Sequence, residues 1–181
     1  MSIHLNDPLL LFGKGLTVFF QGLFALLGIA AIFIIPVILL ASQDMLPESL
    51  ELDLPIIDTS ASSVLIIAAL LFMIAAAMIM FFGKLRAIIS TVGDGDPFIP
   101  ENAQRLSTMA WLLLGIQVAG LCVGALRLYL ANAVASTADA TESLNLGIDD
   151  FEGLIMALIL FILARVFRHG AAMRDDLEGT V

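Results

Sequence analysis

The order of apolar and polar positions divides the chain into four long apolar stretches separated by polar segments. The apolar stretches cover residues 16–40, 64–82, 109–126 and 150–167. A helix rises about 1.5 Å per residue, so stretches of this length can cross the hydrocarbon core of a bilayer. The pattern predicts an all-α fold, in which residues 1–181 form one polytopic membrane domain with four transmembrane helices in a bundle.

The fourth stretch is strictly uncharged only from Gly153 to Ala164. Glu152 precedes it, at a helix N-terminus where the helix dipole favours negative charge. Arg165 and Arg168 follow it, and their long side chains can extend back to the membrane surface. With these ends included the helix is long enough to cross, and we expect it to do so.

The polar segments alternate in the sign of their charge. Residues 42–63 and 128–149 contain Asp and Glu but no Lys or Arg, whereas every basic residue except Arg127 lies in or beside the other three polar segments. Short cytoplasmic loops retain Lys and Arg. The alternation therefore predicts that both termini, the loop 83–108 and the tail 168–181 are cytoplasmic, and that the two acidic loops face the other side.

Composition supports a membrane protein and limits its chemistry. The chain is 60% hydrophobic, with a mean hydropathy of +1.04 and a net charge of −9. A negative net charge usually argues against nucleic acid as a direct partner, and we expect none. Here the sum misleads, because nearly all the excess negative charge lies in the two acidic loops, whereas the predicted inside segments carry seven acidic and seven basic residues. The single cysteine, Cys122, excludes an internal disulfide and a cysteine-based metal site.

The sequence offers no set of catalytic residues. The apolar stretches contain no His and no Lys, and the two histidines, His4 and His169, lie at opposite ends of the chain. Metal sites and hydrolytic mechanisms need ligands or a general base at suitable spacing. We therefore expect no enzymatic activity, no cofactor and no metal.

The loop 83–108 contains the sequence GDGDPFIP at residues 93–100. Two Gly and two Pro within eight residues indicate a turn. The acidic residues lack the ligand spacing of a calcium loop, and the strand and Lys of a phosphate loop are missing. Pro100 and Glu101 suit the first turn of a new helix. We interpret the segment as a structural turn, with a contact surface for a partner as the alternative.

The tail from Arg165 onward changes from basic to acidic along its length. It is predicted to lie on the same side of the membrane as the loop 83–108. Charged segments of this kind are usually solvated, but here two of them converge on one face. We predict that this face docks a partner. The candidate docking residues are Asp94, Asp96, Pro97, Phe98, Pro100, Glu101, Asn102, Arg105, Arg165, Arg168, Arg174, Asp175, Asp176 and Glu178.

Small residues recur along the third apolar stretch, at Gly115, Ala119, Gly120 and Gly124. Spacings of four place small residues on one face, where helices approach closely in lipid. We favour helix packing within the chain; a homodimer is the alternative.

Two segments resemble a known family. They are GDPFIPENAQRL at residues 95–106, which leads into Trp111, and ARVFRHGAAMRDDLEGTV at residues 164–181. Both are similar to the bacterial membrane proteins grouped as domain of unknown function 2975. The resemblance implies a multi-pass protein of the bacterial inner membrane, with four spans and no assigned activity. It also implies a partnership, because such proteins are often encoded beside a small Cro-type helix-turn-helix regulator.

Two functional hypotheses follow. The first is a regulatory or adaptor protein that binds a small helix-turn-helix regulator through the loop and tail. The second is a small transporter or channel component. Transport paths need polar groups at mid-membrane, and Gln21 and Gln117 are the only amides in the four apolar stretches. The first hypothesis is therefore favoured.

Overall fold

The computed structural model describes residues 8–41, 61–134 and 149–178, and these residues form four helices. The helices are α1 (Pro8–Ala41), α2 (Ala61–Gly93), α3 (Pro100–Val134) and α4 (Asp149–Glu178). The described ranges contain no strand, and each helix includes a segment long and apolar enough to cross a membrane. The predicted all-α, four-span architecture is confirmed, and the chain is a multi-pass membrane protein.

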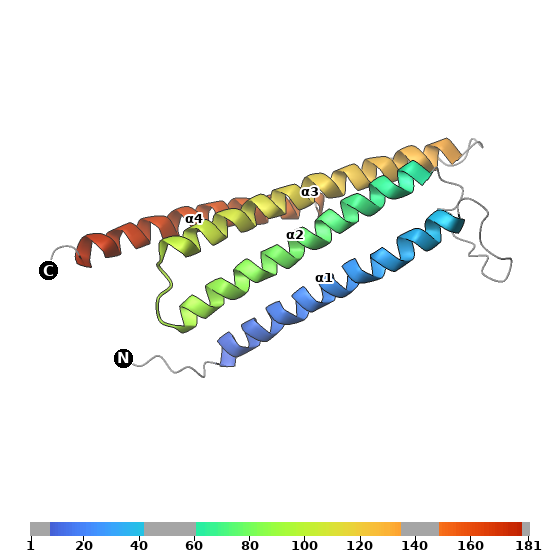
Figure 1. Ribbon diagram of the computed structural model, residues 1–181. Coiled ribbons are helices and arrows are strands. Elements are labelled where there is room, and N and C mark those ends of the chain that lie inside the picture. The colour runs from blue at the N-terminus through green and yellow to red at the C-terminus, as the bar shows by residue number, and fades with distance from the viewer. Residues whose placement is uncertain (1–7, 42–60, 135–148, 179–181) are drawn as a thin grey trace.

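The helices run alternately up and down, so one end of the molecule carries the start of α1, the loop 94–99 and the end of α4 (Figure 1). We call this end the loop end. The opposite end carries the end of α1, the start of α2, the end of α3 and the start of α4 (Figure 1). The predicted loops 42–63 and 128–149 lie largely outside the described residues. Which side of the membrane each end faces stays a prediction.

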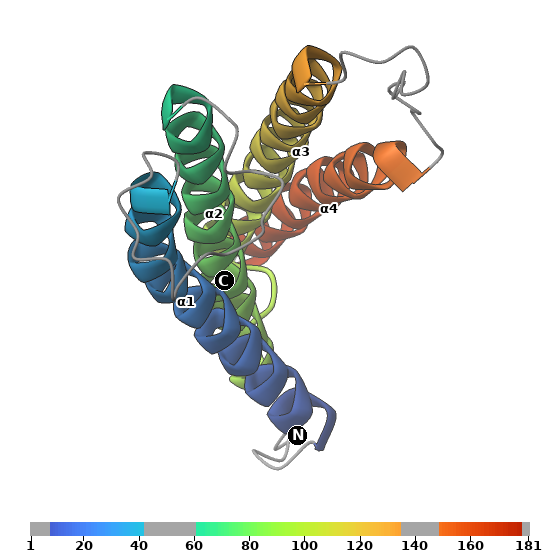
Figure 2. The same cartoon turned by 90° about the vertical axis from the view of Figure 1, so that its right-hand side faces the viewer.

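The four helices form an open row. Among the described helices, backbones approach closely only between α1 and α2, α2 and α3, and α3 and α4. Seen along the bundle, α4 diverges from α2 on the far side of α3 (Figure 2). The loop end is the better packed part of the row.

Each predicted span lies within one helix, but the helices are longer. The stretch 64–82 is part of a helix that continues to Gly93, and the stretch 109–126 is part of one that already starts at Pro100. Lys84 and Arg86 do not interrupt α2, because a helix can continue past the bilayer while long basic side chains reach water. Most of the predicted inside loop 83–108 is therefore helical.

Buried side chains gather near the loop end. A cluster of Ile88 from α2, Leu106, Met109 and Ala110 from α3, and Leu160 and Ala164 from α4 forms the core. Elsewhere large apolar side chains such as Phe19, Phe33 and Leu71 are more than half exposed. Lipid would cover these surfaces in a membrane, so only the loop end relies on extensive packing between protein side chains.

Helix α1 is joined to α2 by aromatic stacking and one polar contact. The rings of Phe20 and Phe82 stack with centroids 4.9 Å apart. The Gln21 amide donates to the carbonyl of Ile79 over 3.2 Å. A Cβ at Gly83 would lie 3.1 Å from Gln21 Nε2, so glycine makes room for the amide.

Candidate functional site

Helix α2 ends in a hydrogen-bonded turn that requires glycine. The N–H of Gly95 donates to the carbonyl of Val92 (3.1 Å), and the N–H of Asp96 donates to that of Thr91 (3.0 Å). This pair of bonds is the Schellman arrangement, which needs a left-handed residue just past the helix. Gly95 supplies it with φ of 85°. The predicted turn is confirmed, and it places Asp96 directly beyond the helix end.

Helix α3 starts five residues after Gly95. Pro100 occupies its first position, where the missing N–H costs nothing, and Glu101 lies in its first turn. The N–H of Asn102 donates to the carbonyl of Ile99 over 3.0 Å. The short connection holds the start of α3 close to the end of α2.

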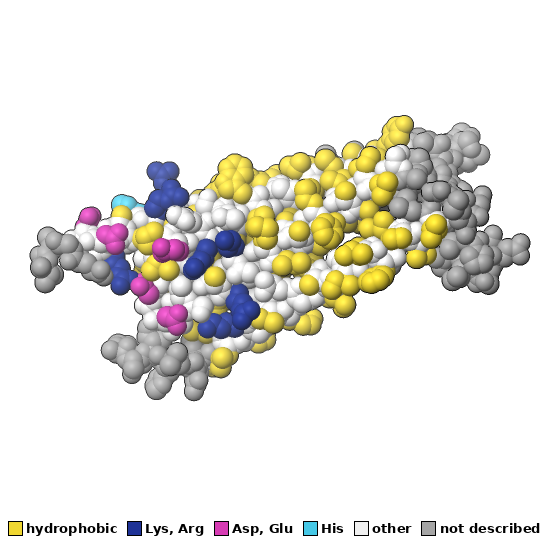
Figure 3. All heavy atoms as spheres, in the orientation of Figure 1, with side chains coloured by type: hydrophobic (Ala, Val, Ile, Leu, Met, Phe, Trp, Pro, Cys, Tyr) yellow, Lys and Arg dark blue, Asp and Glu magenta, His cyan; other side chains and the backbone are white. Residues whose placement is uncertain are grey.

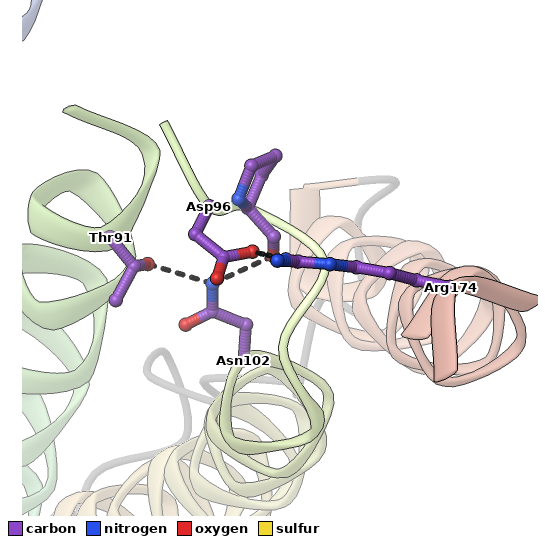
Figure 4. Close-up of polar contacts among 5 residues, drawn as sticks. Thr91, Asp96, Asn102 and Arg174 are labelled. Atoms are coloured by element: carbon purple, nitrogen blue, oxygen red, sulfur yellow. Dashed lines mark hydrogen bonds and ion pairs between the residues drawn. The ribbon is translucent and has the colours of Figure 1, made fainter. Parts of the chain in front are cut away.

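The side chain of Asn102 is fully buried and ties this connection together (Figure 4). Its Nδ2 donates to Thr91 Oγ1 (2.7 Å) and to the carbonyl of Pro97 (2.8 Å). Its Oδ1 accepts from Arg105 Nη1 (2.7 Å), and the Thr91 hydroxyl itself donates to the Ile88 carbonyl (2.8 Å). Both amide donors are thus used, and one side chain links α2, the loop and α3.

Helix α4 closes the site from the other side. Asp96 forms an ion pair with Arg174. The rings of Phe98 and Phe167 lie 5.2 Å apart between centroids. A Cβ at Gly170 would lie 2.8 Å from Cδ1 of Phe98, so the ring rests directly on the α4 backbone. The Asp96 and Arg174 side chains are 41% and 46% exposed, and a pair this exposed contributes only about 0–1 kcal/mol. The aromatic contact therefore carries more of the attachment.

The structure separates the candidate docking residues into two groups. Asp96, Pro97, Phe98, Asn102, Arg105 and Arg174 make the internal contacts described above. Asp94, Pro100, Glu101, Arg165, Arg168, Asp175 and Asp176 are exposed. The side chain of Glu178 lies outside the described ones. Asn102 is the clearest correction, because a side chain with no exposed surface cannot contact a docked protein in this conformation.

Thr91, Phe167 and Gly170 belong to the site but were not among the predicted residues. Gly170 carried a usable signal, because a glycine inside a helix costs about 1 kcal/mol and so suggests a packing reason. Nothing in the local sequence marks Thr91 or Phe167 as contacts of the loop.

The small residues of α3 differ from one another. Ala119 is 3% exposed, whereas a Cβ added at Gly115 or Gly120 would meet nothing within 4 Å among the described residues. Gly124 is half-buried. Of the predicted packing residues, Ala119 is the one buried within the chain, and the homodimer stays a prediction.

No group of three or more His, Cys, Asp or Glu side chains in the described ranges could hold a metal ion. A family model described as protein of unknown function (DUF2975) matches residues 41–181, which is more than half of the chain. No curated protein and no solved structure shows significant similarity to this chain. The family match covers every residue of the loop end except those in α1.

Proposed function

The chain belongs to the family of proteins of unknown function DUF2975, and from this premise we propose that it is a regulatory or adaptor protein of the bacterial inner membrane. In this proposal the loop end is cytoplasmic and binds a small helix-turn-helix regulator. Binding would hold the regulator at the membrane and lower its concentration on DNA.

The observation that supports this proposal is a charged surface built on a fixed loop. The Asn102 hydrogen bonds and the Phe98–Gly170 contact tie residues 94–99 to three helices. A surface that is already ordered loses little conformational entropy when a partner binds. The loop end is therefore suited to recognition.

The loop end carries both basic and acidic side chains, and the exposed acidic ones form its outermost part (Figure 3). Asp94 and Glu101 are exposed at the loop, and Asp175 is exposed on the last turns of α4. Acidic side chains gather at the loop end, beyond most of the basic ones (Figure 3). DNA-binding proteins carry basic surfaces that neutralise phosphates. The acidic outermost part of the loop end is thus complementary in charge to the basic surface of such a protein.

The transporter hypothesis gains no support from the two amides in the spans. Gln21 donates to the α2 backbone. The Gln117 side chain lies directly against Gly153 of α4. Both amides thus have contacts within the bundle.

Crosslinking in native membranes tests the proposal. The full-length protein would be crosslinked mildly, purified, and the bound proteins identified by mass spectrometry. A triple variant, Asp94→Asn, Glu101→Gln and Asp175→Asn, removes three exposed charges without touching the internal contacts. Three exposed ion pairs of about 0.5 kcal/mol each predict a loss of bound regulator on the order of tenfold.

The matched control keeps the charges and changes only side-chain length: Asp94→Glu, Glu101→Asp and Asp175→Glu. We expect it to retain the regulator. The proposal fails if no DNA-binding protein is recovered with the wild-type chain. It also fails if the neutral triple variant recovers as much of that protein as the control does.

A further inference from the structure

An open pocket of about 560 Å³ lies between α3 and α4 near the loop end. Its volume is within the range of about 300–1,000 Å³ that is typical of small-molecule sites. The lining residues are Ser107, Phe161, Ala164, Arg165, Arg168, His169 and Ala172. Ser107 comes from α3 and the others come from α4. The loop contacts described above do not use any of these seven side chains.

The α4 residues of the pocket form one face of the helix. Arg165, Arg168, His169 and Ala172 follow one another at spacings of three, one and three residues, which places them on the same side. Phe161 and Ala164 continue this face toward the membrane-spanning part. The pocket thus changes from apolar to basic along a single helix face.

The basic groups of the pocket have no acidic neighbours in it. No carboxylate is among the lining residues. In the part of the chain that the structure describes, Asp96 and Arg174 form an ion pair, whereas Arg165 and Arg168 have no ion-pair partner. Both guanidinium groups are on exposed side chains. The two guanidinium groups and the Ser107 hydroxyl are therefore hydrogen-bond donors that can bind an anion from outside the chain.

The position of Trp111 indicates that the pocket lies at the level of the membrane surface. Trp111 packs edge-on against Phe161, with ring centroids 5.4 Å apart, and is 66% exposed. Tryptophan with exposed surface is enriched at the level of lipid headgroups. Basic side chains lie mostly between the apolar surface and the acidic loop end (Figure 3). Arg165 and Arg168 would then lie where lipid phosphates do.

We propose that this pocket binds the headgroup of an anionic phospholipid. The guanidinium groups of Arg165 and Arg168 hold phosphate oxygens, because their planar forks match phosphate geometry. The Ser107 hydroxyl donates to the same headgroup, and the first part of an acyl chain lies along Phe161 and Ala164. The inference does not depend on the regulator, because it concerns a lipid held at the side of α4.

Native mass spectrometry of the full-length protein in detergent tests the proposal. Phosphatidylglycerol, cardiolipin and the zwitterionic phosphatidylcholine would be added separately, and the lipid-bound fraction measured. A direct hydrogen bond from an arginine to a phosphate oxygen contributes about tenfold in affinity. We expect Arg165→Gln/Arg168→Gln to lower binding of both anionic lipids by at least about tenfold. Binding of phosphatidylcholine should not change.

The matched control is Lys84→Gln/Arg86→Gln, which removes two basic residues of α2 outside the pocket. We expect it to bind anionic lipid like the wild type. A second variant, Ala172→Trp, fills the pocket without changing its charge and should also lose the lipid. This variant keeps the proposal testable if the arginine variant does not fold.

Three results would overturn the proposal. One is an equal loss of anionic lipid in the pocket variant and in the α2 control. Another is unchanged binding in Ala172→Trp. The third is displacement of the lipid by millimolar inorganic phosphate, which would identify the pocket as a site for free phosphate.

Discussion

At the scale of single residues, Asn102 combines complete burial with three side-chain hydrogen bonds. Its side chain has no exposed surface, and it donates two hydrogen bonds and accepts one. A buried polar group is stabilising only while its partners are present, since an orphaned donor or acceptor costs about 1–3 kcal/mol. The Asn102 amide thus stabilises the one loop conformation in which all of these partners are in place.

Asn102→Ala should destabilise the protein by about 2–4 kcal/mol, because it leaves the Pro97 carbonyl and an Arg105 donor without their partner. Thermal unfolding in detergent, followed by circular dichroism, measures the change. Gln104→Ala is the control, because Gln104 is exposed on the same turn of α3. Equal shifts in Tm for the two variants would contradict the role assigned to Asn102.

The local features of this site could be predicted from the sequence, whereas its long-range contacts could not. Pro100 and Glu101 mark a helix start through local backbone chemistry, and Gly95 lies in a turn signal. The burial of Asn102 depends on Thr91, which reaches it only because α2 ends and the chain reverses. Polar residues in a cytoplasmic loop are usually solvated, so composition suggested a surface position for Asn102.

At the scale of helices, hydropathy marked the spans but not the helix ends. It detects the part of a helix that contacts lipid, whereas the hydrogen-bonded backbone continues until a residue stops it. In α2 that residue is Gly95, beyond Lys84 and Arg86. The row-like order of the helices could not be predicted, because apolar faces in lipid need no protein partner.

A glycine in α4 and a glycine in α3 should respond differently to substitution by alanine. Gly170 makes room for the Phe98 ring, whereas Gly115 faces open space. In a helix, alanine is favoured over glycine by up to about 1 kcal/mol, but overpacking a contact costs about 1–3 kcal/mol. Gly170→Ala should therefore be less stable than Gly115→Ala by about 1–3 kcal/mol.

Thermal unfolding of the two alanine variants measures this difference. Hydrogen exchange of residues 94–99 should increase in the Gly170 variant alone, because the ring must leave α4. Adding Phe98→Leu should reduce the penalty. If both glycines respond alike, the Phe98 ring does not hold the loop on α4.

At the scale of the whole molecule, the charge pattern predicts an orientation that can be measured. The loop end carries seven of the eight Lys and Arg residues, so it should be cytoplasmic. Single cysteines would be placed in a Cys122→Ala background, at Glu101→Cys, Asp175→Cys and Ser62→Cys. An impermeant maleimide should label the first two only in inverted vesicles and the third only from outside. Labelling of positions 101 and 175 from opposite sides would contradict the four-span topology.

The open row also has a consequence for how the chain is assembled. Among the described helices, each one packs only on its neighbours in chain order. A growing chain can therefore add its spans in the order of synthesis, without waiting for a distant partner. The loop 94–99 is the exception, because Phe98 and Asp96 can contact Gly170 and Arg174 only after α4 has been made. Synthesis of α4 thus completes the surface at the loop end, and a chain truncated before Gly170 would insert its earlier spans yet lack that surface.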